Sequence, residues 1–154
     1  MPKVEVIGRS KESATDTAST ETAMIEFAQE YEFDTLFLIQ ATSPLLTADD
    51  LDGGFELYNK ENTDSVLSVV RQKRFCWRTD ERGIASPINY DFSRRPRRQE
   101  FEGYLVENGA FYITSRNNLL KDKNRLSGKI RAYEMKEDSY FEIDEPSDWI
   151  IIEN

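Results

Sequence analysis

Short apolar runs alternate with segments that have helical spacing along this chain. Strands are predicted where an apolar or alternating run ends at turn-forming residues, over 36–39, 65–70, 110–113, 130–135 and 140–143. Residues 71–80 also look extended. Helices are predicted where capping residues precede apolar positions at helical spacing, over 20–31 and 47–60, after Ser115, and from Pro146 onwards.

Strands that alternate with helices in the first half favour an α/β fold. We expect a Rossmann-like, doubly wound and mainly parallel sheet with helices on both faces. The sequence contains no repeat and no low-complexity linker, so we expect one domain over residues 1–154.

Composition and charge limit the kinds of partner that this chain is expected to bind. The 154 residues are 38% hydrophobic and 32% charged, and no apolar run approaches the roughly 20 residues that cross a bilayer, so we expect no membrane partner. The formal net charge of −9 argues against general nucleic-acid binding. A lone Cys76 rules out an internal disulfide and fits a reducing, intracellular compartment. Because histidine is absent, any metal would be a hard cation on carboxylate oxygens.

The segment Gln40–Leu45 follows directly after the apolar run at residues 35–39. It contributes an amide, two hydroxyls and a proline at the end of a buried strand. Open α/β sheets bind ligands at the carboxyl ends of their strands. The segment therefore predicts a polar, stiff rim beside a ligand site.

Two charged clusters have competing interpretations. Glu142 and Asp144 are two residues apart on an expected strand, so both carboxylates would point to one face and could hold a divalent metal, or simply face solvent at a sheet edge. Residues 94–98 place four arginines in five positions. Such a run can be a solvated loop, an anion-binding site or a nuclear localisation signal, so the protein is expected in the nucleus or otherwise in the cytoplasm.

Four segments in this order resemble one enzyme family. They are Asp16–Thr20, Gln40–Leu45, Arg95–Gln99 with Glu107–Tyr112, and Glu142–Asp144 with Asp148. Together they resemble the N-acylneuraminate cytidylyltransferases (CMP-N-acylneuraminate synthetases), and the arginine run, Glu107–Gly109 and Ala132–Met135 are closest to animal members. The resemblance implies transfer of CMP from CTP to the anomeric hydroxyl of a sialic acid, with release of pyrophosphate, on a nucleotide-sugar transferase type of fold.

The resemblance also implies roles for individual residues. Arg98 and Gln99 would hold the sugar acid, and together with Asp144 they are the expected catalytic residues. Glu142 and Asp144 would hold Mg²⁺, although the family usually has aspartate where Glu142 stands. Further substrate-binding residues are expected at Gln40 beside both substrates, at Ser19 and Thr20 near the nucleotide, and at Asn108 and Gly109 near the sugar; Ser19 and Thr20 are equally well explained as helix caps. Relatives are homodimers or tetramers, and residues 75–77 would lie either at the subunit interface or in the core.

The family's glycine- and basic-rich loop, of the form Ala-Arg-x-x-Ser-Lys-Gly, does not occur in this sequence. We therefore expect a partial cytidylyltransferase domain that is incomplete at its N-terminus, with strand 36–39 at an unpaired sheet edge. An alternative function follows from this expectation. The chain would be a catalytically incompetent homologue or fragment that keeps its sugar-acid and dimerisation surfaces.

Overall fold

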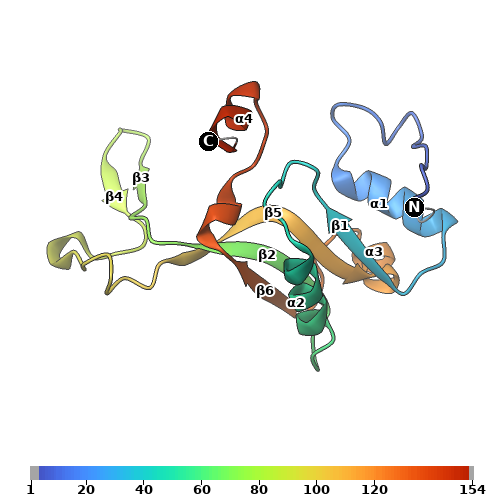
Figure 1. Ribbon diagram of the computed structural model, residues 1–154. Helices are drawn as coiled ribbons and strands as arrows, with labels where there is room; N and C mark the ends of the chain where they lie inside the picture. Colours follow the sequence, from blue (N-terminus) through green and yellow to red (C-terminus); the bar gives the residue numbers. More distant parts are fainter. Residues whose placement is uncertain (1–3, 153–154) are drawn as a thin grey trace.

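The computed structural model describes residues 4–152 as an α/β structure (Figure 1). The elements in chain order are α1 (Thr20–Glu30), β1 (Thr35–Ile39), α2 (Ala48–Tyr58), β2 (Ser65–Gln72), β3 (Trp77–Thr79), β4 (Ala85–Pro87), the 3₁₀ turn η1 (Phe92–Arg94), β5 (Tyr104–Ser115), α3 (Arg116–Asp122), β6 (Ile130–Met135), the 3₁₀ turn η2 (Glu137–Tyr140) and α4 (Pro146–Ile152). Within residues 4–152, none of the helices has the length and apolar character that a membrane crossing requires.

The main sheet has the strand order β1-β5-β2-β6. β5 is antiparallel to both β1 and β2, whereas β2 and β6 are parallel. β1, β2 and β6 therefore run in the same direction, and β5 runs against them. The expected α/β class is confirmed, and so is the position of β1 at an edge of the sheet as far as the described residues extend.

Helices cover both faces of this sheet. On one face α2 packs against a core that includes Val66, Val70, Phe111 and Ile113, all fully buried. On the other face Met24 and Ala28 of α1 and Leu119 of α3 form a second buried cluster. Neighbouring positions on β1 point to opposite faces, because side chains alternate along a strand, so Phe37 joins the first core and Leu36 and Leu38 the second.

Capping fixes where the helices begin. The Ser19 hydroxyl accepts a hydrogen bond from the Thr22 amide, and Ser115 does the same for Asn118. Thr47 and Asp50 form a reciprocal capping box at the start of α2. These caps were read from the sequence and are confirmed.

Residues 73–103, here called the arm, leave the sheet between β2 and β5 (Figure 1). The arm carries the β3–β4 hairpin, which no strand of the main sheet joins within the described chain. Phe75 packs on Tyr90 and Phe101 with ring centroids 4.3 and 4.9 Å apart, while Trp77 is 48% exposed. Phe75 therefore lies in a small aromatic core of the arm, and Trp77 lies on its surface.

Candidate functional site

The carboxyl ends of three strands meet at one edge of the sheet, because β1, β2 and β6 run in the same direction. Gln40 follows β1, Gln72 is the last residue of β2, and Lys136 follows β6. Open α/β sheets bind their ligands at this kind of edge. The rim predicted from Gln40–Leu45 therefore lies where the sequence placed it.

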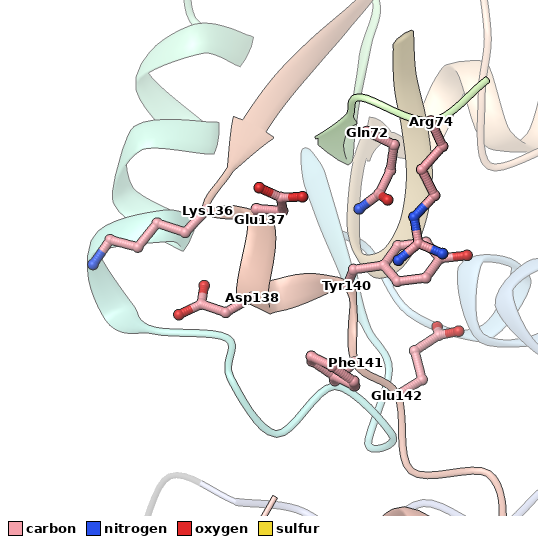
Figure 2. Close-up of a pocket in the computed structure, with 8 residues that line it drawn as sticks. All are labelled: Gln72, Arg74, Lys136, Glu137, Asp138, Tyr140, Phe141 and Glu142. Atoms are coloured by element: carbon pink, nitrogen blue, oxygen red, sulfur yellow. The ribbon is translucent and has the colours of Figure 1, made fainter. Parts of the chain in front are cut away.

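A cavity of about 810 Å³ opens at this edge (Figure 2). Gln72 and Arg74 come from the end of β2 and the start of the arm, and the other lining residues come from η2 and the residues on either side of it. The lining consists of Gln72, Arg74, Lys136, Glu137, Asp138, Tyr140, Phe141 and Glu142. Of these, only Glu142 was a candidate from the sequence. The carboxyl-end rule that selected Gln40 points to the end of β2 as well, but the predicted strand stops at Val70, two residues before Gln72.

A bulge in β5 brings three of the predicted site residues together. The β2–β5 register shifts between Leu67 and Val69, and the Ser68 hydroxyl accepts a hydrogen bond from the Phe111 amide at 3.0 Å. Gly109 lies in this bulge with φ of +65°. A Cβ atom at Gly109 would lie 2.9 Å from Glu142 Oε1 and 3.6 Å from Gln40 Nε2. Gln40, Gly109 and Glu142 are therefore neighbours, and the glycine permits this close approach.

The strand expected over residues 140–143 is wrong. Residues 137–140 form η2 instead, and Asn108 holds this turn by donating to the Ser139 carbonyl at 2.9 Å. Beyond the turn, the Ile143 amide donates to the Thr42 carbonyl at 2.8 Å. The segment after η2 is therefore hydrogen-bonded to the rim at residues 40–45 and does not add a strand to the sheet. The prediction that Glu142 and Asp144 lie on the same face of a strand is therefore wrong.

The two carboxylates still influence one another. Partial burial raises the pKa of Glu142, and the negative charge of Asp144 raises it further. Asp148 accepts hydrogen bonds from the Asp144 and Glu145 amides at 2.9 and 2.8 Å, so it caps the start of α4. Within residues 4–152, no group of three or more acidic, cysteine or histidine side chains is gathered for a metal. Two mutually repelling carboxylates suit a divalent cation that takes its other ligands from water and substrate.

Arg98 belongs to the arm and lies beside Glu137, one of the residues that line the cavity. It lies with the exposed Gln99 in the turn at residues 98–100, and its Nη2 is 3.9 Å from Glu137 Oε1. Arg98 also lines a neighbouring cavity of about 550 Å³, together with Lys73, Phe75 and Arg95. Arg74 lines both cavities, so the two are adjacent.

Ser19 and Asn108, two of the predicted substrate contacts, have structural roles, and Thr20 lies at a different cavity. Ser19 is the exposed N-cap of α1, and Thr20 lines a separate apolar cavity of about 250 Å³ between α1 and β1. Asn108 is buried and positions η2 through Ser139. The structure does not bring Ser19 and Thr20 to the cavity at the carboxyl edge, and their nucleotide contacts stay predictions.

The chain is similar to named proteins over nearly its whole length. It is 38% identical to N-acylneuraminate cytidylyltransferase A of Danio rerio over 149 residues, 94% of this chain and 34% of that protein. It is 37% identical to N-acylneuraminate cytidylyltransferase of Oncorhynchus mykiss, over 97% of this chain and 35% of the relative. For the Streptococcus agalactiae serotype V enzyme the identity is 26%, over 96% and 36%. No protein-family model matches the chain.

The fold is also found in a solved structure. 4-diphosphocytidyl-2C-methyl-D-erythritol synthase from Anaerococcus prevotii superimposes with a TM-score of 0.62 at 10% identity, covering 88% of this chain and 65% of that one. At that identity the likeness concerns the fold alone. The chain spans about a third of the length of the curated relatives that it matches. The resemblance read from the sequence is thus confirmed, and the chain is a relative of the N-acylneuraminate cytidylyltransferases that corresponds to about one third of their length.

Proposed function

We propose that the carboxyl-edge cavity belongs to a site that transfers CMP from CTP to the anomeric hydroxyl of an N-acylneuraminate. One observation carries the proposal: Gln40, Gly109 and Glu142, picked from separate segments of the sequence, are neighbours at the edge where α/β sheets bind ligands. The named relatives support the same reaction. The sugar hydroxyl attacks the α-phosphorus of CTP, the bond from that phosphorus to the oxygen that bridges to the β-phosphate breaks, pyrophosphate leaves with the bridging oxygen, and the proton of the hydroxyl passes to solvent.

In this proposal each residue aligns a substrate or balances charge. Arg98 and Gln99 bind the sugar acid, and the Gln40 amide lies between the sugar and the nucleotide. Glu142 and Asp144 hold a divalent cation, which we propose to be Mg²⁺; when bound, it neutralises charge on the phosphates. These residues form no covalent bond with either substrate, because positioning and charge neutralisation suffice for phosphoryl transfer.

A second candidate is a protein that binds the sugar acid without turning it over. It is favoured by the absence of an Ala-Arg-x-x-Ser-Lys-Gly sequence from these 154 residues. Such a chain would keep the sugar-acid cavity while holding CTP poorly.

Titration of the 154-residue chain separates the two candidates. If the chain transfers CMP, calorimetry should show binding of both N-acetylneuraminate and CTP, and a steady-state assay with Mg²⁺ should yield CMP-sugar. If the chain only binds the sugar acid, calorimetry should show binding of N-acetylneuraminate with little binding of CTP, and the assay should show little or no CMP-sugar. Failure to bind the sugar would contradict both candidates.

We propose further that the arm pairs two copies of the chain. Trp77, Ile84, Ile88 and Phe92 are exposed on it, with 66% of Phe92 accessible. Clustered exposed apolar side chains of this kind mark interaction surfaces. A homodimer fits this surface, since an interface between identical subunits can be self-complementary.

Replacing Trp77 and Phe92 together by serine is therefore expected to convert a dimer into a monomer. Sedimentation velocity measures the change, and unaltered circular dichroism would show that the main sheet survives. Ile130→Ser is the matched control, because Ile130 is an exposed apolar residue on β6 rather than on the arm. Wild-type chain that sediments as a monomer at high concentration would refute the arm interface.

A further inference from the structure

Gln72 is a buried polar residue whose side-chain oxygen has no partner among the described residues. It ends β2, faces Tyr104 of β5 in the ladder, and is only 7% exposed. Its carbonyl oxygen is buried and has no hydrogen-bond donor among the described residues. Buried side-chain oxygens normally accept a hydrogen bond, because an unpaired one costs free energy, so this oxygen is expected to accept one from a bound ligand.

The Gln72 amide points into the 810 Å³ cavity, on the same side as the Arg74 side chain (Figure 2). The main chain at Arg74 is fixed, because its carbonyl accepts a hydrogen bond from Asn89 Nδ2 at 2.9 Å. In this view the Tyr140 ring overlaps the Arg74 guanidinium, and the Glu142 carboxylate is drawn below them. Gln72 pairs with Tyr104, five positions along β5 from Gly109, whereas the Glu142 carboxylate lies beside Gly109, so Gln72 and Glu142 line different parts of the wall.

The charges of this wall favour an uncharged ligand group. The two basic side chains, Lys136 and Arg74, are outnumbered by three acidic ones, so the cavity has no excess of positive charge. A carboxamide both donates and accepts hydrogen bonds, as do hydroxyl and acylamido groups. A carboxylate only accepts, and so it could not supply the donor that the Gln72 carbonyl lacks.

We propose that Gln72, assisted by Arg74, determines which acidic sugar binds, by hydrogen bonding to an uncharged hydroxyl or acylamido group remote from the reacting carbon. This inference rests on the proposed function, because it takes the sugar acid as the ligand of the cavity. It adds a contact that discriminates between sugars with different substituents. Truncating that contact changes sugar affinity and leaves the cation and nucleotide groups untouched.

The test compares wild type with Gln72→Met, which keeps the length of the side chain and removes its hydrogen bonds. Calorimetry gives the Kd for N-acetylneuraminate and for analogues that each lack one polar group, including the deaminated sugar. We expect Gln72→Met to bind the parent sugar about tenfold more weakly. For the analogue that lacks the contacted group, wild type and variant should bind equally, which identifies that group.

Arg74→Gln serves as the second variant, since Arg74 is exposed and its replacement leaves the core intact even if Gln72→Met does not fold. It should weaken the parent sugar while the thermal midpoint stays at the wild-type value. Unchanged affinity in the folded variants, or an equal loss for every analogue, would overturn the inference alone. A wild-type chain that binds no sugar acid would overturn the proposed function, and the inference with it.

Discussion

Gly54→Val is expected to destabilise the fold by roughly 3 kcal/mol, because overpacking a full core forces side chains and backbone to shift. Gly54 is buried on α2, and a Cβ atom there would lie 2.5 Å from Cε2 and 2.7 Å from Cζ of Phe111. Phe111 is fully buried in the core beneath α2, so its ring cannot swing into solvent. Urea denaturation measures the change in the free energy of unfolding.

Gly53→Val is the matched control, one position earlier on the same helix. A Cβ atom at Gly53 would meet the tip of the Tyr133 ring at 2.6 Å, but Tyr133 is partly exposed and can move. The loss at Gly53 should therefore be clearly smaller than at Gly54. Equal losses would mean that the backbone entropy of the two glycines, rather than contact with Phe111, sets the cost.

Gly54→Val should also change the candidate site. α2 begins at Ala48, directly after the rim and its Thr47 cap, so a helix pushed off the sheet displaces residues 40–47 as well. The main-chain N–H of Gln40 donates a hydrogen bond to the main-chain carbonyl of Ala110 at 3.1 Å, and Ala110 is next to Phe111 in the chain. Gly54→Val should thus weaken sugar binding together with stability, even though Gly54 does not line the cavity.

The glycine pair illustrates what the sequence can and cannot predict. The helix predicted over residues 47–60 forms as α2 (Ala48–Tyr58) despite Gly53 and Gly54, which helix propensity alone counts as a cost. The compensating gain is the close seating of the helix on Phe111 and Tyr133, which depends on residues more than 50 positions away. Local pattern therefore predicts the helix, and only the packed sheet explains its glycines.

Strand predictions succeeded where apolar residues dominate and failed where hydrogen bonds to distant segments decide. β2 continues two residues past the predicted end at Val70, because Arg71 and Gln72 still pair with β5. Its polar end hides Gln72 from an apolar pattern, although it is the end that faces the cavity. Residues 140–143 look like a strand, but the Asn108 amide fixes η2 just before them, and one hydrogen bond ties Ile143 to Thr42.

The candidate site shows the same division. Gln40 could be chosen from the sequence because it follows a predicted strand, and Glu142 because it belongs to a motif that resembles the family's, although the strand expected there is wrong. Their meeting at Gly109 depends on a β-bulge, which follows from pairing with β2 rather than from residues near Gly109. The sugar-facing roles of Arg98 and Gln99 stay predictions, and Arg98 offers the sharpest test.

Arg98→Ala is expected to weaken sugar-acid binding by about 10- to 100-fold, since a charge-assisted hydrogen bond contributes about 1.5–3 kcal/mol. Loss of its ion pair with Glu137 costs little stability, because both side chains of this 3.9 Å pair are exposed. The thermal midpoint should therefore stay at the wild-type value while the Kd for N-acetylneuraminate rises. Calorimetry at low and moderate salt measures the Kd.

Arg97→Ala is the matched control, since it removes the same charge from the same turn. The Arg97 main chain still forms the turn in that variant, because its carbonyl accepts from the Glu100 and Phe101 amides at 3.0 and 3.1 Å whatever the side chain is. If Arg98 contacts the sugar acid, Arg97→Ala should bind almost as wild type does, and the difference should persist at moderate salt. If both variants lose affinity equally and salt abolishes the loss, the arginine run acts only as a long-range positive charge, because screening removes interactions beyond about 10 Å at 0.1 M salt. Sugar affinity unchanged in Arg98→Ala would remove Arg98 from the site.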